Sequence, residues 1–394
     1  MAVGHKQATA PRRPGPTAPA RWQGLTLVEL MVAIAVALIL LAGVLQLFVS
    51  NKKAYRVQEG ASLLNENFRY AISQLEYSIR MAGHWGGAKE SAIRVRDEVA
   101  PQNDCASSPA FKNLSGAAQD IAFGVEGFDG SATPPIDCIP QGQYFPGTDV
   151  LLVRYASASR ECLATTRSDE TACIASNPDL ADQRMLRAAA SYGADLFVGK
   201  DFSRLYGPNG TSTSPDIMPV DSSADRDLVG NYTVNFEVYF VRRCNTPTLL
   251  NDKDAEKPCS GSSADIPTLS RLVLRGDRLT LEDLVSGVEQ FQVTYGVDDD
   301  SDRAPNRFVN AAEARAGDAN GSLWNRVTAA RLSLVMRNNE KDASHSEGAT
   351  IYRLYGGEDG SAFQFKPDSE DAGLYHRRAF SISVQSRNTL RNIR

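Results

Sequence analysis

A single carboxylate and a preceding glycine mark the longest apolar run of the chain. Residues 25–50 read LTLVELMVAIAVALILLAGVLQLFVS, and Glu29 is their only charged residue. A carboxylate deep in hydrocarbon costs about 2.5–3.5 kcal/mol on insertion scales and less near an interface, so its presence there predicts a partner. Gly24 stands directly before the run, whereas a secretory signal places its small-residue cleavage site after the apolar core. Cleavage at Gly24 would therefore leave the apolar segment on the mature protein.

The segment before this glycine has the composition of a leader rather than of a folded domain. Residues 1–24 are rich in Pro and Ala, contain no acidic residue and show no core-forming pattern. Their basic residues are Lys6, Arg12, Arg13 and Arg21. At about 1.5 Å of rise per residue, a helix over 25–50 crosses a bilayer core of about 30 Å. We therefore predict a cleaved basic leader, in the cytoplasm by the positive-inside bias, and a transmembrane helix over 25–50.

The residues around this junction resemble a known processing signal. Gly24 to Ala35, GLTLVELMVAIA, is similar to the class III signal of type IV pilins and type II secretion pseudopilins. The resemblance implies that a prepilin peptidase cuts after Gly24 and methylates the new amino terminus at Leu25. It also implies that Glu29, then the fifth residue, neutralises the terminal amine of a neighbouring subunit during assembly. Such a pair removes two isolated charges from an apolar bundle at once.

A second helical pattern follows the apolar run. Residues 51–83 contain an apolar stripe at spacings of three and four, typical of an amphipathic helix. The stripe consists of Leu64, Phe68, Ile72, Leu75 and Ile79. No proline occurs between residues 25 and 100, so one long helix is expected, ending at Gly83, Gly86 and Gly87.

From residue 88 to 394 the pattern changes to short strands separated by polar loops. Strict alternation predicts strands at residues 232–240, 291–295 and 380–384, and apolar runs predict two more at 150–155 and 330–336. Long loops rich in Ser, Asp, Gly and Pro are expected at 101–120, 129–148, 207–227, 245–268 and 298–322. The fold class is therefore α+β, with a long N-terminal helix packed on an antiparallel β-sheet domain.

All six cysteines lie beyond the apolar run, which suits an oxidising compartment. They are Cys105, Cys138, Cys162, Cys173, Cys244 and Cys259. Six cysteines allow fifteen pairings, and nearest-neighbour closure is one of them, each bridge contributing about 3 kcal/mol on the chain-entropy model. No CxxC or CxH spacing supports the rival explanation, a metal site.

One acidic cluster has ligand types that suit calcium. Asp298, Asp300 and Asp302 stand at alternate positions and are followed by Asn306. An EF-hand loop would need Gly at Arg303 and Glu at Val309, and the chain has neither. A solvated acidic turn is the alternative, and no other cofactor is expected.

Catalytic motifs are not evident in the sequence. The four histidines, His5, His84, His345 and His376, are isolated, and no P-loop, H-E-x-x-H or G-x-S-x-G motif occurs. We therefore do not expect an enzyme. The net charge of −5 and the scattered basic residues give no nucleic-acid footprint. A group of arginines near the C-terminus keeps a DNA-uptake role open; its members are Arg377, Arg378, Arg387, Arg391 and Arg394.

Three later segments, residues 284–302, 329–338 and 377–394, resemble the PilW-like minor pilins more loosely. This resemblance implies a subunit that primes type IV pilus polymerisation, at the pilus tip and with a tip adhesin. The implied partners are other minor pilins and the major pilin through the N-terminal helix, the prepilin peptidase and the inner-membrane assembly platform. The domain would lie in the periplasm and later on the cell surface. A minor pseudopilin of a type II secretion system, or a DNA-uptake or adhesion pilin, remains an alternative.

Overall fold

The chain forms two compact units, residues 1–58 and residues 59–394. The computed structural model describes Gly24 and residues 26–88, 92–95, 123–139, 142–162, 167–189, 193–205, 229–245, 259, 265–276, 278–318, 322–343, 345–347, 350–355, 363–367 and 372–388. The predicted loops at 101–120 and 207–227 lie outside these described residues.

Helix α1 (Leu27–Met81) runs without interruption through 55 residues, as the absence of proline predicts. It ends two residues before Gly83, whose φ of 70° is left-handed backbone that favours glycine. Gly83 donates its backbone N–H to the carbonyl of Arg154, which ties the end of the helix to the sheet domain. The predicted stop is therefore confirmed.

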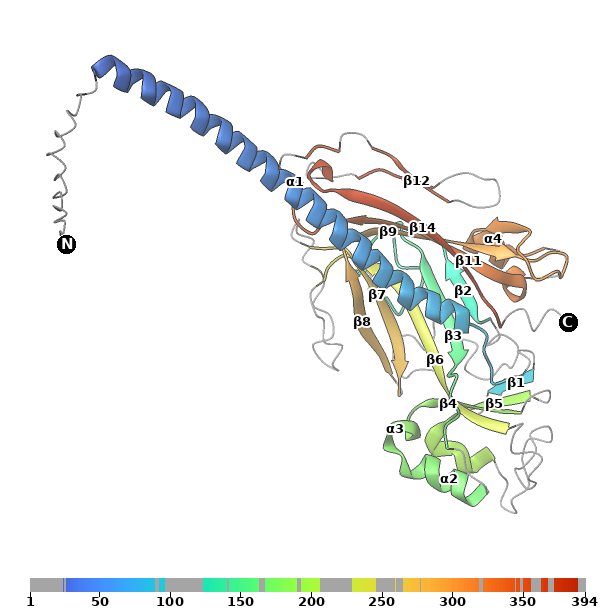
Figure 1. Ribbon diagram of the computed structural model, residues 1–394. Coiled ribbons are helices and arrows are strands. Elements are labelled where there is room, and N and C mark those ends of the chain that lie inside the picture. The colour runs from blue at the N-terminus through green and yellow to red at the C-terminus, as the bar shows by residue number, and fades with distance from the viewer. Residues whose placement is uncertain are drawn as a thin grey trace, which may run out of the picture. The chain divides into compact units, whose positions relative to one another are not determined.

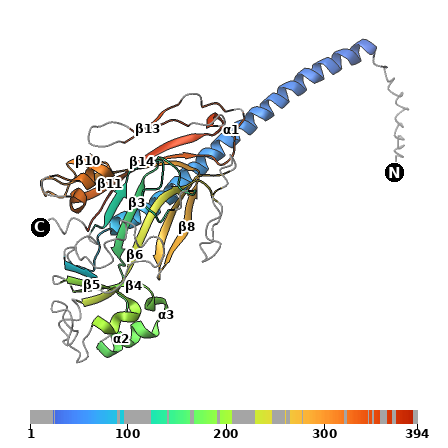
Figure 2. The ribbon, with the colours of Figure 1, turned by 180° about the vertical axis from the view of Figure 1, so that it is seen from behind.

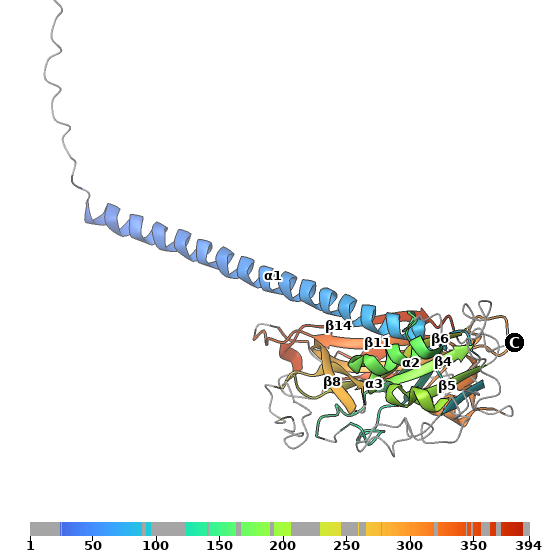
Figure 3. The ribbon, with the colours of Figure 1, turned by 90° about the horizontal axis from the view of Figure 1, so that it is seen from below.

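The second part of α1 buries the predicted apolar stripe. Leu64, Ile72, Leu75 and Ile79 are buried, and Phe68 is half-buried and stacks on Phe380 with ring centroids 4.1 Å apart. The last turns of α1 cross the strands in Figure 1 and form a separate layer over them in Figure 3. The amphipathic pattern thus produces one helix packed on a sheet layer.

An eight-stranded sheet forms the larger part of the domain. Its strands are β1 (Ile93–Val95), β2 (Val125–Phe128), β3 (Val150–Ala156), β4 (Arg184–Ala189), β5 (Gly193–Val198), β6 (Val229–Arg242), β7 (Thr268–Arg275) and β8 (Arg278–Ser286). The order along one path is β1-β5-β4-β6-β3-β2, while β7 pairs with both β6 and β8. All these pairs are antiparallel except β1 with β5.

A second, four-stranded antiparallel sheet packs beside it in the order β10-β9-β11-β14. Its strands are β9 (Val288–Val297), β10 (Arg307–Val309), β11 (Val327–Arg337) and β14 (Arg377–Gln385). A small hairpin pairs β12 (Tyr352–Leu354) with β13 (Phe363–Phe365). The five strands that the sequence predicts correspond to β3, β6, β9, β11 and β14, so the antiparallel α+β fold class is confirmed.

One core lies between α1 and both sheets. It unites Leu75 and Ile79 of the helix with residues such as Tyr239 of β6 and Phe291 of β9. A second core covers the other face of the eight-stranded sheet and includes Trp85 and Phe236. The sheet is therefore buried on both faces.

A third, small core lies where β4 and β5 meet the helices α2 (Arg167–Ser176), α3 (Pro178–Ala181) and η4 (Gly199–Leu205). Figures 1 and 2 both show α2 and α3 at this end of the sheet. The sequence did not predict these helices. The prediction of a loop over residues 298–322 was incomplete, because this segment contains β10 and the helix α4 (Ala311–Ala316). The remaining short helices are η5 (Leu323–Arg326) and η6 (Ala372–Leu374).

We predict that Leu75→Ala lowers the free energy of unfolding by about 2–5 kcal/mol, because it leaves a cavity in the core beneath α1. Leu75 has no exposed surface, whereas Tyr70 on the same helix is 49% exposed. Tyr70→Ala is the matched control and should change stability by no more than about 0.5 kcal/mol. Urea unfolding of the full-length protein in detergent, followed by the fluorescence of buried Trp85 and Trp324, measures both. Equal losses in the two variants would contradict this account of the helix face.

Candidate functional site

Glu29 and Thr26 together cap the N-terminus of α1. The backbone N–H and the hydroxyl of Thr26 each donate to Glu29 Oε2 at 3.0 Å, and Glu29 N–H donates to Thr26 Oγ1 at 3.3 Å. This reciprocal arrangement is a capping box, which satisfies two amide groups that a helix end otherwise leaves free. The signal for this cap in the sequence is the Thr-x-x-Glu spacing from Thr26 to Glu29, which the prediction for Glu29 did not include.

The second oxygen of this carboxylate stays available. Glu29 Oε1 has no hydrogen bond to any residue that the structure describes, and the side chain is exposed. The carboxylate can therefore cap its own helix through Oε2 and accept from a second group through Oε1. A cationic donor would suit it best, since charge-assisted hydrogen bonds are the stronger ones.

Gly24, two residues before the cap, is exposed, and the fold does not require a glycine there. A Cβ built on Gly24 meets no atom within 4 Å. Leu25, the predicted new amino terminus, lies outside the described residues. A glycine without a packing role is consistent with recognition by another protein.

The first part of α1 has the properties of a membrane anchor. Among the described residues, α1 is the helix that is long and apolar enough to cross a bilayer, and its most apolar window is not buried. Large apolar side chains from Leu27 to Val49 are exposed around the helix. This surface needs hydrocarbon or other helices around it, so the chain is membrane-anchored.

A buried polar cluster beneath α1 resembles a site but is structural. Ser78 of the helix hydrogen-bonds Tyr239 at 2.9 Å, and the Glu237 carboxylate accepts from Tyr239 at 2.9 Å and from Tyr155 at 3.1 Å. Arg271 Nη1 lies 3.4 Å from Glu237. Burial, with the Glu237 charge, raises the pKa of both tyrosines far above the usual range, so their hydroxyls stay protonated donors. The cluster anchors α1 to β3, β6 and β7.

The predicted acidic cluster does form on the loop between β9 and β10. One carboxylate oxygen from each of Asp298, Asp300 and Asp302 lies within 4.8 Å of the others. Asp298 is buried and accepts the backbone N–H groups of Ser301 at 2.7 Å and Arg303 at 2.9 Å. These bonds hold both residues in left-handed backbone, with φ of 65° and 75°.

The other two carboxylates of the cluster also have partners within the loop. Asp302 accepts from Ala304 N–H at 2.7 Å, and Asp300 accepts from Asn306 Nδ2 at 3.1 Å. The bond from Asn306 lowers the pKa of the Asp300 carboxyl. The loop is therefore closed by its own hydrogen bonds, and calcium binding stays a prediction.

If calcium binds here, millimolar Ca²⁺ should raise the Tm of the full-length protein in detergent relative to EDTA, because a ligand of the folded state stabilises it. The double variant Asp300→Asn with Asp302→Asn should lose that shift. Glu59→Gln, which removes an exposed carboxylate from α1, should keep it. Equal Tm values for the unmodified protein with and without Ca²⁺ would contradict calcium binding at this loop.

Two of the predicted disulfides are present. Cys162 bonds Cys173 across 11 residues, and Cys244 bonds Cys259 across 15 residues. Cys138 is also disulfide-bonded, while its predicted partner, Cys105, lies outside the described residues. For these two pairs, nearest-neighbour disulfide pairing is confirmed, and the alternative explanation of these cysteines as metal ligands is not.

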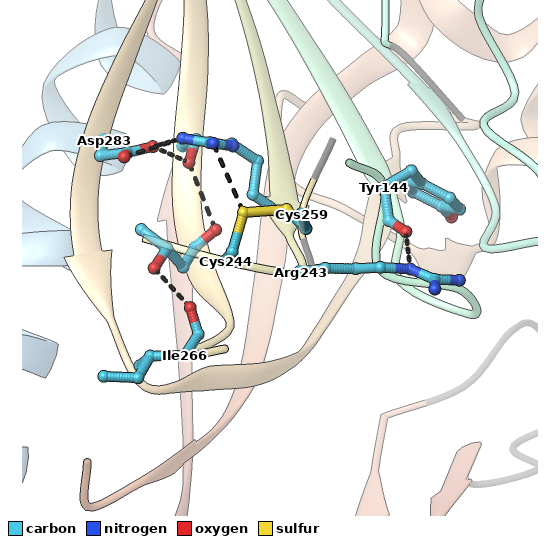
Figure 4. Close-up of a disulfide and its surroundings, with 9 residues drawn as sticks. Tyr144, Arg243, Cys244, Cys259, Ile266 and Asp283 are labelled. Atoms are coloured by element: carbon cyan, nitrogen blue, oxygen red, sulfur yellow. Dashed lines mark hydrogen bonds and ion pairs between the residues drawn. A yellow bond between two sulfur atoms is a disulfide. The ribbon is translucent and has the colours of Figure 1, made fainter. Parts of the chain in front are cut away.

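The bridge between Cys244 and Cys259 joins the end of β6 to the residues before β7. Figure 4 shows it beside Asp283, which accepts from Arg242 Nη1 at 2.9 Å, while Arg243 Nε donates to the carbonyl of Tyr144 at 2.9 Å. Arg242 is fully buried and also donates to Cys244 Sγ at 3.6 Å. The disulfide thus lies at the end of a long central strand, beside an ion pair in which Arg242 is buried and Asp283 is partly exposed.

The C-terminal arginines do not form one basic surface. Arg377 is buried, donating to Glu289 and at 2.6 Å to Glu347, whereas Arg378 is exposed and donates to Asn65 at 3.0 Å. Arg387 is exposed, and Arg391 and Arg394 lie outside the described residues. His376 contacts Asp342 at 3.1 Å and packs on His345. Arg377 therefore does not belong to the basic group that kept a DNA-uptake role open.

Comparisons with known proteins agree with this geometry. Residues 23–45 match the family model described as the prokaryotic N-terminal methylation motif, and residues 238–388 match that of Type IV Pilus-assembly protein W. A search of curated proteins found no match. A solved type IV-like pilin from Thermus thermophilus aligns with 57% of this chain and 98% of its own at 13% identity, but a TM-score of 0.19 supports no structural argument.

The chain is a type IV pilin-like protein with a class III signal. The signal carries Gly24 and Glu29, and the match to the pilus-assembly W model covers the end of β6 and all later strands. A minor pilin of a type IV pilus is the function class that these matches support. Pilins are structural rather than enzymatic proteins.

Proposed function

We propose that this protein is a minor pilin that is processed between Gly24 and Leu25 by a prepilin peptidase and helps to initiate type IV pilus assembly at the pilus tip. The observation that carries the proposal is the position of Glu29 within an N-terminal methylation motif. It caps an apolar helix through one oxygen and leaves the other available. After cleavage, Glu29 becomes the fifth residue and can accept from the terminal amine of a neighbouring subunit.

The proposal includes specific partners. The apolar part of α1 packs laterally against the helices of other minor pilins and of the major pilin, in the inner membrane and then in the filament. The assembly platform in the inner membrane supplies the work, and the folded domain stands on the periplasmic side, where its disulfides form. A tip adhesin is the expected partner beyond the filament.

The alternative functions explain fewer of these observations. A pseudopilin of a type II secretion system would share the motif at 23–45, but the match at 238–388 is to a pilus-assembly family. A DNA-uptake or adhesion pilin needs a binding surface, and for DNA this means a basic stripe. The burial of Arg377 between two glutamates removes one member of the proposed basic surface.

We predict that Glu29→Gln and Glu29→Ala both reduce incorporation into pili at least about tenfold, as expected when a charge pair in an apolar setting is broken. Glutamine still accepts from Thr26 and so keeps the helix cap, whereas alanine loses the cap and the charge. The measurement is the ratio of this chain in sheared pili to that in membranes, by quantitative immunoblot.

Glu59→Gln removes an exposed carboxylate from the same helix and is the matched control, which should incorporate normally. Cleavage should be largely intact in all three variants, whereas replacing Gly24 with a bulky residue should leave the full-length precursor. Normal incorporation of Glu29→Gln, with loss only in Glu29→Ala, would mean that the cap matters and the charge does not.

Deleting the gene should abolish surface pili if this subunit primes their assembly, and a complementing copy should restore them. Pili are sheared from deletion, complemented and parental cells and quantified by the amount of major pilin. Unchanged pili in the deletion strain would contradict a priming role. Secreted proteins from the same cells should then be compared, because a loss there would indicate the secretion-system alternative.

A further inference from the structure

The globular unit has an exposed apolar surface away from α1. Ile351 and Tyr355 are 49% and 52% exposed, and outside α1 they are the large apolar side chains that the described residues leave exposed. They flank β12, and because side chains alternate along a strand, they share a face with the exposed Arg353. Leu354 points to the opposite face and is buried. Two large apolar groups with an arginine between them thus form one continuous surface.

Arg331 of β11 extends onto this surface and is held in place by its neighbours. Its guanidinium carbon lies 3.7 Å from the ring centroid of Phe308 and 4.3 Å from that of Tyr355. Its Nε atom donates to Ser383 Oγ at 3.4 Å. Two aromatic contacts and a hydrogen bond restrain the guanidinium, which lowers the entropy lost when it binds a partner.

The terminal nitrogens of Arg331 are available for that partner. Neither Nη1 nor Nη2 has an acceptor within the described part of the chain, and neither is buried. Other arginines of the domain do have carboxylate partners; they include Arg271 with Glu282, Arg326 with Asp299, and Arg377 with Glu289.

The surface is positively charged, whereas the chain as a whole has a negative net charge. Arg331 and Arg353 have no carboxylate partner among the described residues, in a chain of net charge −5. Two isolated cations beside apolar groups suit a protein segment rather than a nucleic acid, which requires a basic stripe. A planar guanidinium binds a carboxylate through two parallel hydrogen bonds, and Arg and Tyr often dominate protein interfaces.

We propose that Arg331, Ile351, Arg353 and Tyr355 form a docking surface for an acidic segment of another pilin subunit that also carries apolar side chains. A carboxylate of that segment binds the terminal nitrogens of Arg331, and its apolar side chains pack on Ile351 and Tyr355. The inference rests on the proposed function only in taking the partner to be another pilin.

The test uses the full-length chain in its own cells with the photo-crosslinking residue p-benzoylphenylalanine at position 351, which leaves Tyr355 and its contact with Arg331 intact. After illumination, mass spectrometry identifies the crosslinked peptide. We expect an acidic segment of a different pilin subunit, and we expect Arg331→Glu to lower the crosslink yield at least about tenfold. Lys200→Glu is the matched control, because Lys200 is an exposed cation whose ion pair lies elsewhere on the surface, and it should leave the yield unchanged.

Two further variants keep the result interpretable. Arg353→Glu removes the neighbouring cation without breaking a contact of Arg331, so it tests the surface even if Arg331→Glu misfolds. Replacing the partner's carboxylate by lysine should restore the crosslink in the Arg331→Glu chain. A crosslink only to lipid or to a second copy of this chain, or one that neither charge reversal weakens, would overturn the proposal.

The presence of the unmodified chain in sheared pili reports on the proposed function separately. A chain found in pili but giving no crosslink from position 351 overturns the docking surface and leaves the minor-pilin function standing. A chain missing from pili that still crosslinks to another pilin subunit at the membrane overturns the assembly function and supports the docking surface.

Discussion

Burial of one apolar face of α1 against both sheets is the interaction on which the rest of the domain depends. Leu75 and Ile79 are fully buried in a core that also contains residues of β3, β6, β9 and β11. The core draws on strands from both sheets, β3 and β6 from one and β9 and β11 from the other. The helix therefore joins the two sheets into one domain, and the same helix supplies the membrane segment.

Polar groups determine how the helix sits within that core. Apolar contacts are non-directional, so a helix held by them alone could shift along the sheets. Ser78 and Tyr239 remove this freedom, since their 2.9 Å hydrogen bond places one helical residue opposite one strand residue. Glu237 and Arg271 satisfy the remaining polar groups, which avoids the large cost of an isolated buried charge. The network is compatible with specificity of packing rather than with catalysis.

Local patterns predicted the elements whose apolar residues recur regularly along the chain. The stripe from Leu64 to Ile79 appears in the sequence because one side of the helix faces the core. Strands β3, β6 and β9 were recognised from an apolar run or from alternation, although both of their faces are buried. Strand β7 was missed because Ser270 and Arg271 interrupt the apolar residues of TLSRLVLR, which therefore shows neither a clean alternation nor an apolar run. Helix α2 was missed because its composition is polar and it contributes a single residue, Ile174, to its small core.

The candidate functional residues differ in how far apart in the sequence they lie. Gly24 and Glu29 are five residues apart, so sequence spacing alone was enough to single them out as candidates. The surroundings of Arg331 come from β10, β11, β14 and the residue after β12, and only the tertiary fold brings these segments together. The disulfides are intermediate cases, because short separations of 11 and 15 residues make nearest-neighbour closure feasible without specifying it.

Glu29 caps its own helix, and under the proposed function the same carboxylate pairs with a neighbouring subunit. A carboxylate at the third position of a helix lies beside free N–H groups, which favour a negative charge. Thr26 supplies two donors to one oxygen, so part of the hydrogen-bonding capacity of the carboxylate is satisfied within the chain. Under the proposed function, a neighbour's amine would then have to compensate only part of the cost of placing this polar group in hydrocarbon. The capping box would thus make it less costly for a subunit to wait in the membrane before assembly.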